Sequence, residues 1–243
     1  MWPYMVKWGY AHYLVLFLGV ALIVLGCIFL PRLKKKYQLL TFWFLAISTT
    51  FVILWRFIIH YEQTTIDVLF RLTLQVCNFN FLILPLACIR KFKFPKHYLL
   101  FVQALGALFM FFAGDGFKTS GKIYDFDIIT YWYYHWVPIA LPIFMIACKE
   151  FTPKRKYIIP TFLALLGYFY LVTVGNSHLM AHRGYNISNT YSSVFYSENS
   201  PLLSALYDFI PVPMLYLLPI FLFSLVNSYI ITYIFELVKD KTA

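Results

Sequence analysis

The chain has 243 residues, of which 61% are hydrophobic, 21% aromatic and only 12% charged. Soluble domains of this length carry more charge, so the composition excludes an ordinary globular protein and indicates an integral membrane protein. The formal net charge is +10, but the basic residues stand in short tracts directly after apolar runs, which is typical of membrane topology rather than nucleic-acid binding. The four cysteines form no CxxC pair and no spacing that predicts a metal site or a disulfide framework.

Seven apolar runs are each long enough to cross about 30 Å of hydrocarbon as a helix. They cover residues 11–30, 38–60, 67–89, 97–113, 128–148, 157–175 and 208–238. With the basic tracts in the cytoplasm, the positive-inside rule places the N-terminus outside and the C-terminus inside. We therefore predict an all-α, multi-pass integral membrane protein of the plasma membrane, with seven transmembrane helices in a single domain over residues 1–243.

The stretch 67–91 contains the third run and is unusually polar for a membrane helix. At about 100° per residue, six polar residues divide between two faces. One face carries Thr73, Cys77 and Asn80, and the other carries Arg71, Gln75 and Asn78. Because both faces need partners or water, we predict that this helix lies at the centre of the bundle.

The fifth run begins with the aromatic cluster 131–134, for which the sequence predicts a place in an interfacial belt. It contains His135, and we expect Pro138 and Pro142 to interrupt its helix.

Two later segments are expected to be irregular. A polar outer segment, 176–207, begins with a turn that holds Asn176 and His178. The seventh run starts among several prolines, which predicts a kinked or unwound outer end.

Two candidate catalytic residues, Cys77 and His135, are predicted to lie at similar depths in the membrane. At about 1.5 Å per residue, Cys77 lies roughly 15 Å and His135 roughly 10 Å below the outer surface. Other polar residues of the outer half are His12, Arg56, Arg71, Gln75, Asn176 and His178. A thiol beside an imidazole base can attack an ester and form a thioester. Spacing alone does not establish this contact, because the two residues are 58 positions apart.

In such a reaction Gln75, Asn78 or Asn80 would donate hydrogen bonds to the oxyanion, and Arg71 or Arg56 would hold a lipid phosphate. Each residue also has a structural interpretation. A membrane cysteine is commonly an apolar filler, an intramembrane histidine commonly bonds across helices, and arginines pair with acidic residues. The same polar interior fits a transporter, a solute-binding module or a non-enzymatic scaffold.

Two short motifs carry a family resemblance. Leu-Gln-Val-Cys-Asn at 74–78 is followed by Leu-Pro-Leu at 84–86, and His-Trp-Val at 135–137 leads to Leu-Pro-Ile at 141–143. In this order they resemble the YwaF-like family of multispan membrane proteins, which is related to eukaryotic acyltransferases that remodel ether phospholipids. His12 and Gly175-Asn176 are similar to weaker landmarks of that family.

The resemblance implies that Cys77 is the acyl-accepting nucleophile and His135 its base. With the depth match, this leads to the hypothesis that a membrane phospholipid is the acyl donor, and that a lysolipid, another lipid amine or hydroxyl, a lipoprotein N-terminus or water is the acceptor, with no cofactor expected. A more distant resemblance to multispan hydrolases of fatty-acid esters keeps Thr73 as a second candidate nucleophile. The family often has histidine two residues before the cysteine, where this chain has Gln75, which donates a hydrogen bond but cannot act as base.

Overall fold

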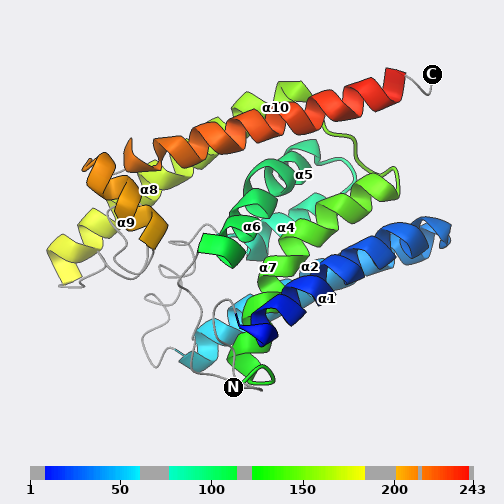
Figure 1. Cartoon of the computed structure of the whole chain (residues 1–243), viewed down its shortest axis with the longest axis horizontal. Coiled ribbons are helices and arrows are strands. Elements are labelled where there is room, and N and C mark those ends of the chain that lie inside the picture. Colours follow the sequence, from blue (N-terminus) through cyan, green and yellow to red (C-terminus); the bar gives the residue numbers. More distant parts are fainter. Residues whose placement is uncertain (1–8, 61–76, 114–121, 184–200, 213–214, 241–243) are drawn as a thin grey trace.

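The computed structural model describes residues 9–60, 77–113, 122–183, 201–212 and 215–240. Within these ranges the regular elements are helices, as predicted (Figure 1). Their bounds are α1 Tyr10–Phe29, α2 Lys35–His60, α4 Asn80–Cys88, α5 Lys93–Tyr98, α6 Ala104–Ala113, α7 Phe126–Ala147, α8 Ile158–Arg183, α9 Pro201–Phe209 and α10 Leu218–Asp240, with short helical turns η1 Leu30–Arg32, η2 Leu99–Gln103, η3 Arg155–Tyr157 and η4 Leu215–Leu217.

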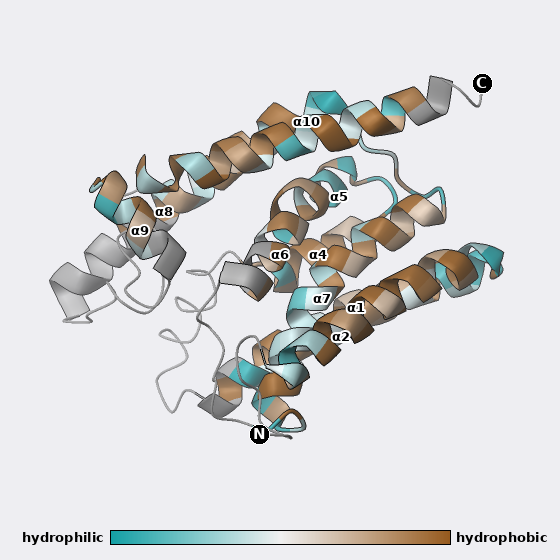
Figure 2. Ribbon diagram, in the orientation of Figure 1, coloured by the Kyte–Doolittle hydropathy of each residue, from teal (hydrophilic) through white to brown (hydrophobic). Residues whose placement is uncertain are grey.

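Three segments of the described chain are long and apolar enough to cross a membrane: Tyr10–Arg32, Lys35–Arg56 and Leu215–Leu237. They correspond to the first, second and seventh predicted runs. Figure 2 shows hydrophobic residues along α1, α2 and α10 and a hydrophilic turn between α1 and α2. A run of this kind needs no partner protein surface, because lipid tails solvate it.

Helix α7 lies at the centre of the described part of the bundle. Helix α7 packs against α1, α2 and α6, and most of its residues from Ile128 to Met145 are buried. It runs unbroken through Pro138 and Pro142, so the predicted interruption is wrong. Each proline removes one backbone donor, but neighbouring helices hold a buried helix in register at such points.

The third predicted run lies only partly within the described residues. Residues 67–76 lie outside the described residues, and Cys77 to Phe79 form a turn that leads into α4. Pro85 inside α4 cannot donate to the carbonyl of Phe81, so the Thr50 hydroxyl of α2 donates to that oxygen instead at 2.9 Å. A side chain of α2 therefore replaces a missing bond within α4.

Three other segments depart from the predicted spans or refine them. The fourth run divides into α5, a π-helix at Leu99–Gln103 and α6. Asn176 and His178 lie within α8, which continues to Arg183, so the expected turn at 176–178 is wrong. The predicted unwinding before the seventh run is confirmed, because α9 ends at Phe209 and α10 begins at Leu218.

Close contact between α1 and α7 depends on two glycines spaced seven residues apart. A Cβ atom on Gly19 would lie within 2.7 Å of three atoms of the Trp136 indole, and one on Gly26 would lie 2.4 Å from the Phe144 ring. Small residues let membrane helices approach closely and gain dispersion contacts. Trp136 and Phe144 fill the space that the two absent side chains leave.

We expect Gly19→Ala to lower the apparent melting temperature of the purified protein, because the new methyl group displaces a buried indole at a cost of about 1–3 kcal/mol. Gly106→Ala is the matched control, since a Cβ there meets no atom within 4 Å, and alanine favours the helix. Equal melting temperatures for Gly19→Ala and wild type would contradict this packing.

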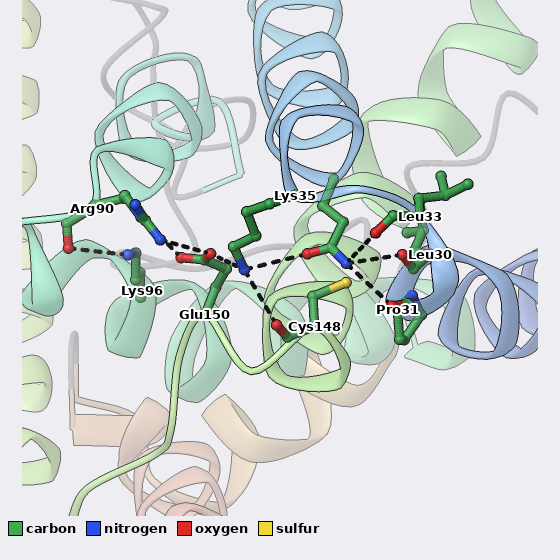
Figure 3. A network of polar contacts seen from close by, with 9 residues as sticks. Leu30, Pro31, Leu33, Lys35, Arg90, Lys96, Cys148 and Glu150 are labelled. Carbon is green, nitrogen blue, oxygen red and sulfur yellow. Dashed lines mark hydrogen bonds and ion pairs between the residues drawn. The ribbon is translucent and has the colours of Figure 1, made fainter.

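The other end of α7 organises a polar network (Figure 3). After Ala147 the backbone N–H groups of Lys149 and Glu150 donate to Ile146 and Met145 at 3.0 and 2.8 Å, with Lys149 in a left-handed conformation at φ 58°. This is a Schellman end, usually made with glycine. It turns Glu150 back toward the neighbouring helices.

Glu150 then joins three segments that are distant in sequence. It forms ion pairs with Lys35 at the start of α2 and with Arg90 after α4, the latter at 3.3 Å. Its side chain is 8% exposed, and although burial raises the pKa of a carboxyl, hydrogen bonds from Lys35 and Arg90 hold the pKa of Glu150 below its ordinary value. The amide of Gln38 donates to the carbonyls of Leu30 and Leu33 at 3.2 and 3.0 Å, which closes the α1–α2 turn.

The lowered pKa of Glu150 predicts a pH dependence. Its ionised form stabilises the fold above the unfolded pKa of about 4.3, and this contribution is lost as pH falls through the lower folded value. Melting temperatures measured from pH 7 to pH 3 should therefore fall on the acid side. Glu150→Gln should be less stable at pH 7 and show a flatter acid limb; an unchanged slope would assign the acid sensitivity to other groups.

Candidate functional site

His135 lies in the middle of α7 with its ring fixed in one orientation. Its Nδ1 lies 2.8 Å from the carbonyl oxygen of Tyr131, one turn earlier. A carbonyl only accepts, so Nδ1 carries the proton of the neutral ring and Nε2 carries the lone pair. Nε2 is buried and has no hydrogen-bond partner in the structure, and the residue is 1% exposed. A buried basic nitrogen is thus available to a ligand.

His97 provides a contrast within the same chain. Its Nδ1 also donates to a carbonyl four residues earlier, that of Lys93 at 2.8 Å. Its Nε2, however, accepts the backbone N–H of Lys154 at 3.1 Å, and its ring stacks on Tyr157 at 4.0 Å. His97 is fully used in joining α5 to the segment before α8, whereas His135 is not.

Aromatic rings enclose the His135 imidazole. Tyr131 and Tyr134 of α7 contact it with ring centroids 4.4 and 4.2 Å away, and Phe111 of α6 contacts it edge-on at 6.1 Å. The cluster 131–134 is therefore mostly part of the core and not the predicted interfacial belt, since Tyr131, Trp132 and Tyr134 are all buried. These rings exclude water and restrict the imidazole to one rotamer.

His12 of α1 reaches the same aromatic cluster from another side. It is fully buried and lies against Trp132 with centroids 5.5 Å apart. Trp132 in turn stacks on Phe111 at 4.9 Å. The structure thus places two predicted histidines around one aromatic core, connected through the rings of Trp132 and Phe111.

Cys77 occupies the turn before α4 and packs against this core. Its sulfur faces the backbone N–H groups of Cys77 and Asn78, and it interacts electrostatically with Arg56. It also interacts with Tyr131, the residue whose carbonyl holds His135. The predicted nucleophile and the predicted base therefore border the same aromatic cluster, with backbone donors at the sulfur.

Arg56, near the end of α2, connects the parts of this site. Its guanidinium lies 5.0 Å from the Tyr134 ring centroid and donates to the carbonyl of Asp127 at 3.5 Å. It interacts electrostatically with both Cys77 and His135. A half-buried guanidinium, with its five N–H donors, can hold an anion here.

The predicted asparagines flank Cys77. Asn78 is buried in the turn, and Asn80 begins α4 with 1% exposure. The Oδ1 atom of Asn80 is buried and has no hydrogen-bond partner within the described ranges of the chain. An unpaired amide oxygen of this kind normally costs about 1–3 kcal/mol, so it marks a place where a ligand or water would be stabilised.

Several predicted site residues lie wholly or partly outside the described part of the chain. Arg71, Thr73 and Gln75 lie outside the described residues. Asn176 and His178 are helical in their backbone, but their side chains also lie outside the described part of the chain. Among the described residues no cluster of three or more His, Cys, Asp or Glu side chains could hold a metal ion.

Two site residues were missed in the sequence. Trp136 buries its indole N–H with no hydrogen-bond partner, 4.7 Å from the Phe111 ring by centroids. Tyr168 of α8 interacts electrostatically with Cys77. The position of Trp136 directly after His135 was visible, but aromatic residues are too common in this chain for that signal to stand out.

Comparison with known proteins identifies the family of this chain. No curated protein and no solved structure matches this chain. The family model described as TMEM164 family matches residues 7–225, which includes α1, the Cys77 turn, the whole of α7 and the start of α10. The chain therefore belongs to the TMEM164 family, a family of membrane proteins.

Proposed function

We propose that this protein is a membrane acyltransferase that takes an acyl chain from a phospholipid through a Cys77 thioester, with His135 as general base. The observation that supports it most is the buried Nε2 of His135. That nitrogen carries a lone pair, has no hydrogen-bond partner among the described residues and borders the same aromatic cluster as Cys77. The His97 ring, in contrast, uses both of its nitrogens.

The proposed reaction has two balanced halves. First, the Cys77 thiol gives its proton to Nε2 of His135, the sulfur attacks the ester carbonyl, and the leaving alkoxide takes that proton and departs as a lysophospholipid. Then an acceptor hydroxyl, amine or water gives its proton to Nε2 and attacks the thioester, and the sulfur leaves and recovers the proton. The acceptor is a lysolipid, a lipoprotein N-terminus or water, and neither half needs a cofactor.

Charge that develops during these steps has candidate donors nearby. The backbone N–H of Asn78 faces the Cys77 sulfur, and Asn80 and Gln75 are the proposed amide donors to the oxyanion. Arg56 lies beside Tyr134 and is proposed to bind the donor phosphate, together with Arg71. Thr73 remains the alternative nucleophile, and His12, Asn176 and His178 remain proposed polar neighbours of the site.

We further propose seven transmembrane helices in the plasma membrane, with the N-terminus outside and the site in the outer half of the bilayer. The support is the clustering of lysine and arginine after α1, α4 and α7 and the rule that such tracts stay in the cytoplasm. Substrate would then enter from the outer leaflet.

Orientation can be tested with single cysteines in a background whose native cysteines are replaced. We expect Lys122→Cys to react with a membrane-impermeant maleimide in intact cells. Lys34→Cys should react only after permeabilisation. The opposite pattern would reverse the proposed topology and place the site in the inner half.

The chemistry can be tested with purified protein and a diacyl phospholipid carrying a labelled acyl chain. Wild type should form a covalent acyl adduct that hydroxylamine releases, because hydroxylamine cleaves thioesters. Cys77→Ala should form none, and His135→Gln should form it at least about 100-fold more slowly, as expected for loss of a general base. Arg56→Gln should raise KM for the phospholipid more than it lowers kcat.

Cys88→Ala is the matched control for Cys77→Ala, and His97→Gln is the matched control for His135→Gln. Cys88 is a buried thiol in α4, and His97 has the same Nδ1 contact as His135. An adduct that persists in Cys77→Ala but not in Thr73→Ala would transfer the role to Thr73. Turnover unchanged in both Cys77→Ala and His135→Gln would favour a transporter or scaffold and reject the acyltransferase.

A further inference from the structure

The formal charge of this protein is concentrated at one end of the bundle. Twelve of the 20 Lys and Arg residues, but only two of the ten acidic residues, lie in segments 32–36, 90–96 and 149–156 and at Glu236. We call this region the basic end. Its excess of positive charge equals the formal net charge of the whole chain, +10. The rest of the sequence is therefore balanced.

Contacts in the structure bring these segments together. Glu150 forms ion pairs with Lys35 and Arg90, which join the start of α2 to the ends of α4 and α7 (Figure 3). Arg155 pairs with Glu236 of α10 at 2.6 Å. Both acidic residues of the basic end are thus already occupied, and within the described part of this region no other carboxylate balances the remaining cations.

Several of the remaining cations lie over aromatic rings. Arg32 lies 5.7 Å from the centroid of Phe29, and Lys36 lies 4.9 Å from that of Tyr37. Both rings are themselves exposed, Phe29 by 56% and Tyr37 by 46%. Exposed rings with cations above them at the ends of apolar helices are the arrangement of a bilayer interface, where the ring meets the acyl boundary and the cation meets phosphate.

We propose that the basic end is a binding surface for anionic phospholipids of the adjoining leaflet, separate from the acyl-transfer site. Each uncompensated Lys or Arg near an anionic membrane surface contributes about 1 kcal/mol of attraction. A soluble polyanion would match the charge but would leave Phe29 and Tyr37 in water. The proposal does not depend on the proposed function, because it involves none of the residues around Cys77 and His135.

The test uses purified protein in mixed micelles with phosphatidylglycerol or phosphatidylcholine of identical acyl chains. Phosphatidylglycerol should raise the apparent melting temperature, and phosphatidylcholine should not. A variant combining Arg32→Gln, Lys34→Gln and Lys36→Gln should lose at least about half of that rise. Lys122→Gln is the matched control, because Lys122 lies 5.6 Å from the Tyr124 ring centroid in the same kind of contact but outside the basic end.

A second variant keeps the charge and so keeps the topology. Phe29→Leu with Tyr37→Leu should reduce the rise while leaving all cations in place, as expected if rings and cations act together at a lipid interface. Equal rises with both lipids, or an equal loss in Lys122→Gln, would overturn the proposal. A rise of the same size with inorganic phosphate would assign the surface to a free anion and also overturn it. Cys77→Ala should keep the full increase in melting temperature with phosphatidylglycerol. The lipid-binding result therefore stands or fails separately from the acyl-transfer test.

Discussion

The structure depends on one constraint, which is that polar groups inside an apolar bundle must find partners within the chain. Hydroxyl side chains satisfy it locally, as Thr49 and Thr232 donate to carbonyls four residues earlier. Where Pro85 breaks the ladder of α4, Thr50 supplies the bond from α2. Nε2 of His135 and Oδ1 of Asn80 are among the buried polar atoms without a hydrogen-bond partner in the described part of the chain, as are Oγ1 of Thr161 and the hydroxyl of Tyr216. The His135 ring contacts Tyr131, and Cys77 packs against the same aromatic cluster, which is the physical reason to treat this region as a candidate site.

The basic end and the aromatic core around His135 satisfy this constraint in different ways. At the basic end the buried carboxylate of Glu150 pairs with two partly exposed cations, whose hydrogen bonds offset the cost of its burial. Around His135 the neighbours are rings, which enclose the imidazole without supplying a partner for Nε2. The basic end therefore joins helices through charges, and the aromatic core holds the His135 imidazole in one orientation.

Composition and basic tracts predicted the helical class and the bounds of α1 and α2 well, because lipid exposure leaves a strong apolar signal. They did not predict that α7 is central, because the sequence indicates polarity and not which helix is enclosed. Gly19 and Gly26 permit the close approach of α1 to α7, but this becomes clear only from the positions of Trp136 and Phe144 against them. Likewise the sequence selected Cys77 and His135 by depth, whereas the state of Nε2 follows from the Tyr131 carbonyl.

The turn at Cys77 is the departure with the largest chemical consequence. In the middle of a helix the N–H groups around a cysteine are bonded to carbonyls four residues earlier and cannot assist a reaction. At residues 77–79 the described backbone forms a turn, whose carbonyls accept from the N–H groups of Asn80, Phe81 and Leu82 three residues later. The Cys77 thiol interacts with the backbone N–H groups of Cys77 and Asn78. Because such donors favour a thiolate, the turn before α4 supports the proposal that Cys77 reacts.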